Sequence, residues 1–187
     1  LCGFKDDRLN IEAYRQNGCP TTLLHEWLHP CGFNASQLSD IQQHISGQAG
    51  KIWESPTHRL LRDRAHLLLV EKQDETDKPV IEMNETSEIG PTGAEFAYVD
   101  ADLITAPLVL RKVQNGDWFV PFGMKGRKLL SDFLTNQKLS RFQKERQWVL
   151  CHDDDIVWAV GVRASELCRL QGDEQEVVEI TYHPAID

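Results

Sequence analysis

The stretch 71–79, Glu-Lys-Gln-Asp-Glu-Thr-Asp-Lys-Pro, interrupts the chain with almost no apolar side chain. Such a stretch cannot bury enough apolar surface to join a core, so it predicts a linker or a loop. A chain of 187 residues is long enough for one medium domain or two small ones. We therefore predict two domains, residues 1–75 and residues 76–187.

The first of these segments is mainly helical in its pattern. Apolar residues recur at helical spacing over three stretches, residues 8–17, 20–29 and 35–45. Asn34 and Gln37 form the sequence signature of a capping box at the start of the third stretch. Residues 51–55 and 59–70 follow as two predicted strands of a hairpin. The segment is thus expected to be mainly helical with a terminal hairpin.

The second segment mixes strands with short helices. Strands are predicted over residues 95–100, 108–113, 118–120, 148–151, 156–161 and 176–182. Helices are predicted over residues 128–135 and 140–146. The whole chain is therefore expected to be of the α+β class, with a small helical segment and hairpin followed by a mixed β/α domain.

Charge is distributed unevenly along the chain. The net charge of −9 argues by itself against a nucleic-acid partner. Residues 106–170, however, contain 11 Lys and Arg against 7 Asp and Glu. This asymmetry favours a local basic surface. Chance clustering on an evenly solvated surface explains the charge alone equally well.

The five cysteines, Cys2, Cys19, Cys31, Cys151 and Cys168, include no CxxC pair. An odd number without regular spacing argues against a disulfide framework and a Cys-based zinc site, so reduced thiols in a cytoplasmic protein are expected. No stretch approaches the roughly 18 to 20 apolar residues that span a bilayer. The N-terminus has no signal-peptide pattern, and it begins at Leu1 rather than Met, so the chain is expected to be part of a longer protein.

One motif suggests a metal site. Residues 25–29, His-Glu-Trp-Leu-His, match HExxH, which on a helix could bind zinc with Glu26 as general base. The next ligand position of the extended motif is Ala35, which cannot coordinate a metal, so a third ligand would have to be His44 or Glu54. The alternative is an amphipathic helix with two histidines on its wetter side. That alternative is favoured, and we expect no metal site.

A cluster of cations is the most informative feature. Lys125, Arg127 and Lys128 crowd the predicted start of a helix, next to Gly123 and Gly126. Cations at a helix N-terminus oppose the macrodipole, so helix stability does not explain them, whereas phosphate binding would. Basic residues continue through the next predicted helix as Lys138, Arg141, Lys144 and Arg146. Solvated surface charge is the alternative for these cations, and core packing is the alternative for the aromatic residues between them.

The order of residues in this region resembles a known family. The matching residues are Gly116–Phe119, Pro121–Gly126, Lys128–Phe133, Lys138, Ile156–Trp158 and Gly161–Arg163. They resemble the C-terminal domain of tRNA(Ile)-lysidine synthetase, and residues 23–60 resemble its middle, substrate-specificity domain. Trp118 departs from the pattern, because an arginine commonly follows the Gly-Asp pair in that family.

The resemblance implies a function for a longer protein. In this family an N-terminal PP-loop domain uses ATP and Mg²⁺ to adenylate C2 of cytidine 34 in tRNA(Ile), and free lysine then displaces AMP. The SGGxDS motif of that domain is absent from these 187 residues, so the chain alone is expected to be non-catalytic and to bind no cofactor. The resemblance also implies that the C-terminal domain is a β-sandwich/α module similar to one in the phenylalanyl-tRNA synthetase β subunit.

The expected partner is therefore tRNA(Ile), with no membrane and with homodimerisation left open. The expected tRNA-binding residues are Lys125, Arg127, Lys128, Lys138, Arg141, Arg146 and Arg163. Two alternatives of other classes are a zinc hydrolase that uses His25, Glu26 and His29, and a protein-interaction or dimerisation module that contacts no RNA.

Overall fold

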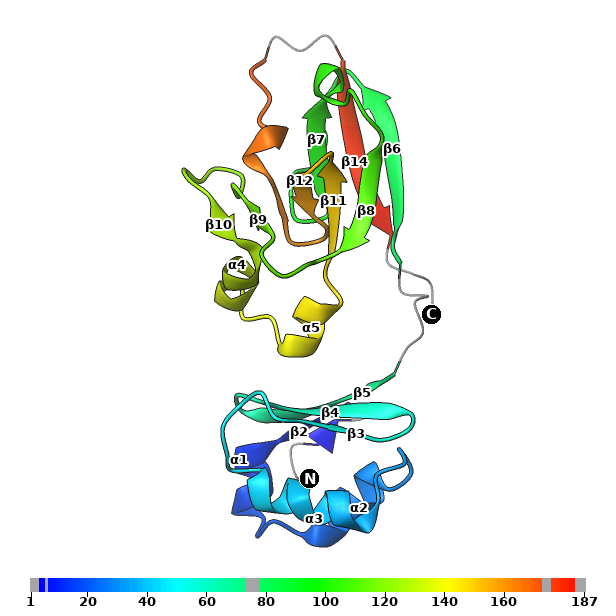
Figure 1. Ribbon diagram of the computed structural model, residues 1–187, viewed down its shortest axis with the longest axis vertical. Coiled ribbons are helices and arrows are strands. Elements are labelled where there is room, and N and C mark those ends of the chain that lie inside the picture. The colour runs from blue at the N-terminus through cyan, green and yellow to red at the C-terminus, as the bar shows by residue number, and fades with distance from the viewer. Residues whose placement is uncertain (1–3, 6, 73–77, 173–175, 184–187) are drawn as a thin grey trace. The chain divides into compact units, whose positions relative to one another are not determined.

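The computed structural model describes residues 4–5, 7–72, 78–172 and 176–183 (Figure 1). The chain forms two compact units, Leu1–Asp74 and Glu75–Asp187. Most of the predicted linker at 71–79 lies outside the described residues, as does Cys2.

The first unit is built on an antiparallel sheet of five strands in the order β1-β2-β5-β4-β3. The strands are β1 (Phe4–Lys5), β2 (Arg8–Asn10), β3 (Ile52–Glu54), β4 (His58–Asp63) and β5 (His66–Glu71). The expected hairpin is thus part of a larger sheet. The prediction of a single strand over 59–70 is wrong, because the chain turns back at Arg64 and Ala65.

Buried Arg62 closes that turn. Its guanidinium donates hydrogen bonds to the main-chain oxygens of Ile45, Asp63 and Arg64. The turn contains neither glycine nor proline, the residues that usually mark a turn in a sequence. The sequence pattern therefore missed it.

Three helices cover one face of this sheet (Figure 1), namely α1 (Ile11–Gln16), α2 (Thr21–Leu28) and α3 (Ala35–His44). The predicted capping box of α3 is confirmed, with both hydrogen bonds between Asn34 and Gln37 at 3.0 Å. The first helix begins later than predicted, because Asn10 belongs to β2 and its side chain caps the helix by accepting from the N–H of Ala13. Leu24, Leu28, Ile41, Leu60 and Leu67 are among the side chains that form the core between helices and sheet.

The second unit contains two larger sheets that pack face to face. A three-stranded sheet has the order β6-β14-β7, and a four-stranded sheet has the order β13-β12-β11-β8. Their strands are β6 (Val80–Thr86), β7 (Phe96–Asp100), β8 (Leu108–Lys112), β11 (Trp148–His152), β12 (Asp155–Ala159), β13 (Arg163–Ala164) and β14 (Val177–His183). One core joins Val99 and Ile180 of the first sheet to Trp158 of the second. The unit is a sandwich, and the predicted α+β class of the chain is confirmed.

The other face of the four-stranded sheet packs on a helix. Val149 of β11 and Ala159 of β12 pair in the sheet and share a second core with Phe133 of α4 (Leu130–Asn136). Leu150 and Trp158 pair next to them and point into the sandwich instead. A bulge follows, at which Val157 has no partner in the register. Both faces of this sheet are therefore buried.

The start of α4 differs from the prediction. The helix was expected from Lys128, but Lys128 and Leu129 form β10, which pairs with β9 (Trp118–Phe119). Leu129 stands at the N-cap without a side-chain cap, and the N–H of Leu130 donates to the main-chain oxygen of Asp117 at 2.8 Å. Strand pairing thus overrides the helical spacing at this end. The second predicted helix is present as α5 (Arg141–Glu145), capped by Ser140 and Gln143.

Four cysteines, Cys19, Cys31, Cys151 and Cys168, are free thiols. Burial raises the pKa of the Cys168 thiol to about 12. In the part of the chain that the structure describes, no helix combines the length and the apolar character needed to cross a membrane.

Candidate nucleic-acid interface

We call residues 121–128 the basic loop; they run from the connection after β9 to Lys128, the first residue of β10, and extend from the side of the sandwich (Figure 1). The loop contains Lys125, Arg127 and Lys128. Its position is set by two carboxylates that flank it in the structure, Asp117 and Glu166.

Asp117 fixes the first end of the basic loop. Its two carboxylate oxygens accept from the guanidinium of Arg111 on β8 at 2.8 and 2.9 Å, and Oδ2 also accepts from the N–H of Gln114. Burial alone would raise the pKa of Asp117, but the hydrogen bonds from Arg111 and Gln114 and the Arg111 charge outweigh it, so the pKa lies below its usual value. The turn before β9 is therefore held to the four-stranded sheet by an ion pair.

Glu166 fixes the loop at Gly123. The N–H of Gly123 donates to Oε2 of Glu166 at 2.7 Å, and Arg169 donates to the other oxygen of the same carboxylate. The hydrogen bond from Arg169, followed by that from Gly123, lowers the pKa of Glu166. Glu166 belongs to the 3₁₀ helix η3 (Glu166–Cys168), which follows β13.

Main-chain contacts complete the support. The N–H of Phe122 donates to the oxygen of Ala164 at 2.9 Å, and the N–H of Glu166 donates to the oxygen of Val120 at 2.7 Å. Pro121 forms a bridge with Ser165. The basic loop is thus fastened along one side to residues 164–166.

Two glycines shape the loop by their backbone conformation. Gly123 has φ of 80° and Gly126 has φ of 92°. A Cβ added at either position would meet no atom within 4 Å. Glycine is therefore required by the left-handed backbone rather than by lack of space, and the open space leaves the main chain accessible to a partner.

The three cations of the basic loop are exposed. Within the described residues, neither the Lys125 nor the Lys128 side chain has a hydrogen-bond or ion-pair partner. Arg127 lies with its guanidinium carbon 3.6 Å from the centroid of the Trp118 ring. The loop therefore presents three positive charges that no carboxylate of the described chain neutralises, an arrangement suited to a polyanion.

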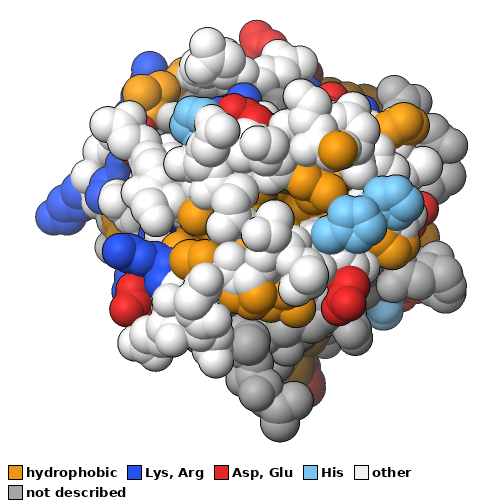
Figure 2. Space-filling view, turned by 90° about the horizontal axis from the view of Figure 1, so that it is seen from below, with side chains coloured by type: hydrophobic (Ala, Val, Ile, Leu, Met, Phe, Trp, Pro, Cys, Tyr) orange, Lys and Arg blue, Asp and Glu red, His pale blue; other side chains and the backbone are white. Residues whose placement is uncertain are grey.

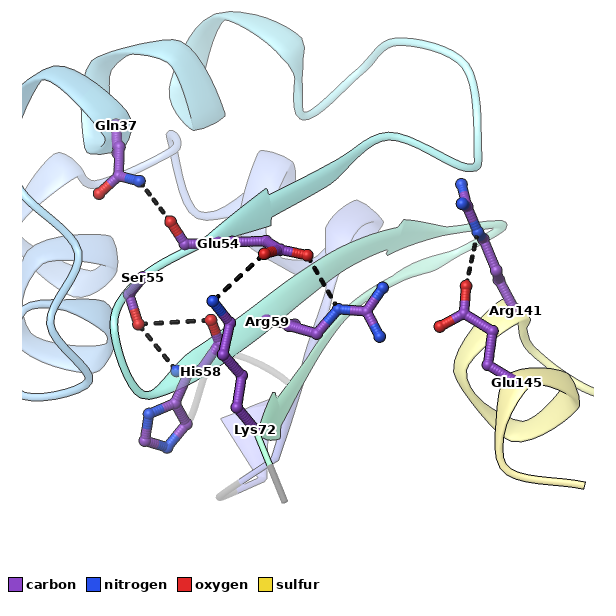
Figure 3. A network of polar contacts seen from close by, with 8 residues as sticks. All are labelled: Gln37, Glu54, Ser55, His58, Arg59, Lys72, Arg141 and Glu145. Atoms are coloured by element: carbon purple, nitrogen blue, oxygen red, sulfur yellow. Dashed lines mark hydrogen bonds and ion pairs between the residues drawn. The ribbon is translucent and has the colours of Figure 1, made fainter. Parts of the chain in front are cut away.

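The other predicted cations lie elsewhere in the second unit. Arg163 is exposed on β13, next to Ala164, which binds the basic loop. Lys138 follows α4 with φ of 63°. Arg141 forms an ion pair with Glu145 at 3.0 Å on α5 (Figure 3). Arg146 is the C-cap of the same helix. The structure thus brings Arg163 to the basic loop and places the other three at the ends of α4 and α5.

Two hollows border the basic loop and η3. The larger, of about 520 Å³, is lined in part by Phe96, Tyr98, Phe122, Arg163 and Arg169. The smaller, of about 350 Å³, is lined in part by Trp118, Arg127, Ser165 and Glu166. Both volumes are within the range of small-ligand sites.

Comparisons with known proteins match both units. Residues 5–72 match the family described as "TilS substrate binding domain", and residues 108–180 match "TilS substrate C-terminal domain". The chain belongs to the TilS family.

The curated relatives carry the name tRNA(Ile)-lysidine synthase. The relative from Parabacteroides distasonis is 36% identical over 95% of this chain and 44% of its own length. The relative from Bacteroides thetaiotaomicron is 39% identical over 91% of this chain and 42% of its own length. The chain thus spans less than half the length of these relatives.

One solved structure supports the fold. The crystal structure of a TilS C-terminal domain aligns with 58% of this chain and 85% of its own length, with a TM-score of 0.51 and 22% identity. An N-terminal fragment of the phenylalanyl-tRNA synthetase β subunit from Pyrococcus horikoshii aligns with a TM-score of 0.43 and 12% identity. The basic loop and all seven predicted cations lie within the C-terminal TilS match.

The HExxH motif lies in the TilS substrate-binding match, at the end of α2, with His29 as the C-cap. His25 and His29 are exposed, and their rings stack with centroids 4.7 Å apart. Figure 2, which views the structure from below, shows two histidine side chains lying together beside apolar ones. No third His, Cys, Asp or Glu completes a metal-binding group with them among the described residues.

The two proposed third ligands have other partners. His44 lies 3.0 Å from the carboxylate of Asp40. Glu54 accepts from Arg59 at 3.1 Å and lies 3.2 Å from the ammonium of Lys72, and Gln37 donates to its main-chain oxygen (Figure 3). Of these contacts, the hydrogen bond from Gln37 joins α3 to β3. The zinc hydrolase alternative is therefore not favoured, and the two histidines lie on the wetter face of an amphipathic helix.

Sequence reasoning missed the residues that position the basic loop. The sequence singles out Asp117 only within the Gly-Asp pair of the family pattern, and it does not single out its partner Arg111. Glu166 and Arg169 lie beyond Gly161–Arg163, the last of the residues that carry the family resemblance. A carboxylate that binds a glycine N–H from 43 positions away leaves no local signal.

Proposed function

We propose that this chain is the tRNA-binding part of a tRNA(Ile)-lysidine synthetase. In the full-length protein, ATP and Mg²⁺ activate C2 of cytidine 34 of tRNA(Ile) through an adenylated intermediate, and the amine of lysine replaces AMP. The role of this chain is to recognise and position the tRNA, and its two domains, residues 1–75 and 76–187, share that role. The chain itself performs no catalytic step, and the protein acts in the cytoplasm.

The observation that carries this proposal is the basic loop. The Lys125 and Lys128 side chains are exposed and without partners among the described residues, on a backbone that Asp117 and Glu166 hold in place. A preorganised loop loses little conformational entropy when it binds, so its charges are available for phosphate contacts. The family match over both units and the name of the curated relatives supply the identity of the RNA.

The remaining predicted contacts, Lys138, Arg141, Arg146 and Arg163, extend the same surface in the proposal. Arg163 adjoins the basic loop through Ala164, and the other three follow α4 and flank α5. An RNA backbone is recognised largely by its shape and by phosphate contacts over an extended area. The acidic remainder of the chain discourages binding of RNA elsewhere.

Charge reversal tests the assignment. In the full-length protein, Lys125→Glu combined with Lys128→Glu should weaken tRNA(Ile) binding on the order of 100-fold, since each charged hydrogen bond contributes about 1.5 kcal/mol or more. Filter binding at a fixed salt concentration measures the affinity. Unchanged affinity in the double variant would refute the assigned surface.

A matched control separates local contacts from net charge. Lys78→Glu changes the net charge by the same amount as Lys125→Glu, and Lys78 is an exposed residue before β6. We expect Lys78→Glu to leave the affinity within about twofold, as for long-range charge effects that salt screens. Equal losses in the two single variants would mean that general electrostatics, not the basic loop, governs binding.

Oligomeric state distinguishes the remaining alternative. A dimerisation module without RNA contact would form a stable homodimer and would not bind tRNA in a salt-sensitive manner. Sedimentation of the chain with and without tRNA(Ile) measures both properties together. The proposed function requires a tRNA complex, whether the protein is a monomer or a homodimer.

A further inference from the structure

Two aromatic rings of the second unit remain at its surface, close to the basic loop. Phe119, Phe133 and Trp158 are at most 3% exposed, whereas Trp118 and Phe122 are each 37% exposed. Trp118 directly precedes Phe119 in β9, and Phe122 lies in the basic loop itself. Each of the two exposed rings has a guanidinium over its face, and the two pairs differ in charge.

In the pair at Phe122, a carboxylate neutralises the charge of the arginine. The Arg169 guanidinium lies 5.1 Å from the Phe122 ring centroid, and the same guanidinium forms an ion pair with Glu166. That carboxylate also receives the N–H of Gly123. Arg169 is thereby committed to the internal support of the loop.

In the pair at Trp118, no carboxylate of the described residues neutralises the charge of the arginine. The Arg127 guanidinium lies 3.6 Å from the Trp118 ring centroid, which is the distance of stacked planar groups. Within the described residues, Arg127 forms no ion pair or hydrogen bond. Its N–H donors and its charge are thus available, and both groups line the smaller hollow of about 350 Å³.

A stacked indole and guanidinium form a platform for another planar group. Unpaired bases of RNA stack on aromatic rings and on guanidinium planes, whereas bases inside a duplex are already stacked on their neighbours. We propose that Trp118 and Arg127 bind an unpaired nucleobase, and that Lys125 and Lys128 contact the phosphates beside it. This inference rests on the proposed function and adds that the RNA must present a single-stranded nucleotide to the basic loop.

The chemistry of the neighbours favours a nucleotide over an acidic peptide. A peptide carboxylate would pair with the guanidinium edge and would gain nothing from the indole face. A nucleotide uses both kinds of group at once, because it has a flat base and a charged phosphate one sugar apart. The two unpartnered lysines of the same loop supply the phosphate contacts.

The test compares two RNAs that differ only in their bases. One is a fluorescein-labelled hairpin whose stem ends in four unpaired nucleotides, and the other has abasic riboses at those four positions. We expect the full-length protein to bind the first RNA more tightly by on the order of tenfold, as stacking on one aromatic ring contributes. Fluorescence anisotropy measures both affinities.

Variants assign the difference to the platform. Trp118→Ala should abolish the preference for the base-containing RNA and leave binding of the abasic RNA within about twofold, because phosphate contacts remain. Arg127→Lys keeps the charge but removes the plane, so it should reduce the preference in the same direction. Leu103→Ala, which removes an exposed apolar side chain of the same unit, is the matched control and should retain the preference.

The outcomes separate this inference from the proposed function. If the unmodified protein binds both RNAs equally, or if Trp118→Ala weakens both equally, the stacking platform is overturned and the phosphate surface stands. If the unmodified protein binds neither RNA nor intact tRNA(Ile), the proposed function fails as well. Thermal melting of each variant establishes that the exposed substitutions leave the fold intact.

Discussion

At the scale of single residues, the ion pair between Arg111 and Asp117 determines where the basic loop starts. The Asp117 side chain is 11% exposed and that of Arg111 is 27% exposed. Removing one partner of such a pair leaves the other without its counter-charge. The pair therefore stabilises both the second unit and the geometry of its candidate interface.

Asp117→Asn should destabilise the protein by about 2 kcal/mol, because it replaces hydrogen bonds to a charged acceptor and leaves Arg111 unpaired. Urea unfolding of the chain measures the change. Asp153→Asn is a matched control, since the Asp153 side chain is 74% exposed, and it should change the stability by less than about 0.5 kcal/mol. Similar effects of the two substitutions would contradict a structural role for the pair.

The same pair gives the stability a dependence on acid pH. The pKa of Asp117 lies below its usual value of about 3.9. A lowered pKa in the folded state means that the carboxylate stabilises the fold above pH 4 and that this contribution is lost as the pH falls through the folded-state pKa. The stability difference between the unmodified chain and Asp117→Asn should therefore be full at pH 6 and shrink below pH 4. A difference that grows on acidification would reverse the assigned sign.

The exposed cations could be predicted as residues, but their environment could not. Lys125, Arg127 and Lys128 stand out in the sequence because it predicts a helix start at Lys128, where cations are unfavourable, although α4 begins only at Leu130. Nothing in the local sequence reveals that Arg127 stacks on Trp118, because that contact depends on the pairing of β9 with β10. The assignment of all seven predicted cations to tRNA binding stays a prediction.

At the scale of elements, the conformation of the basic loop depends on glycine. Gly123→Ala should destabilise the protein by about 1 to 2 kcal/mol, because φ of 80° is unfavourable for a residue with a Cβ. Gly93→Ala is the matched control: its added Cβ also meets no atom within 4 Å, but its backbone is not in the left-handed region. Chemical denaturation of both variants separates backbone strain from packing. A neutral Gly123→Ala would mean that the loop can relax at no cost.

The sequence predicts the ends of an element well where a side chain caps a helix, and poorly where the pairing of one strand with another sets the boundary. Asn34 and Gln37 predict the start of α3 from the sequence alone, because both capping hydrogen bonds join residues three positions apart. The strand character of Lys128 and of Arg8–Asn10 depends on partners distant in sequence, namely Phe119 and β5. The division of residues 59–70 into β4 and β5 depends on buried Arg62, whose acceptor at Ile45 lies in another element.

At the scale of the whole molecule, positive charge is concentrated in one segment of an acidic chain. The chain has a net charge of −9, yet the basic loop offers cations without carboxylate partners in the described structure. If the proposed surface of seven cations contacts the RNA phosphates, binding to RNA should weaken steeply as the salt concentration rises. The composition of residues 106–170 indicates this asymmetry, whereas the local patterns of the first unit indicate only a hairpin and not the five-stranded sheet that contains it.

The slope of log K against log salt concentration tests this view. Lys125→Gln combined with Lys128→Gln should reduce the magnitude of the slope for tRNA(Ile) by about 1.4 to 1.8, which corresponds to two phosphate contacts. Titrations between 50 and 200 mM salt, a range over which such contacts change affinity by about an order of magnitude or more, measure it. A slope that does not change would mean that these two ammonium groups release no counterions on binding.

The hydrogen bond between Gly123 and Glu166 also determines when the basic loop can take its final shape during protein synthesis. Its two residues are 43 positions apart, so the ribosome must make the segment from β10 to η3 before the carboxylate exists to receive the glycine N–H. Until then the nascent chain carries its lysines on an untethered hairpin. A growing polypeptide would therefore acquire its shaped RNA contact only after η3 has been synthesised.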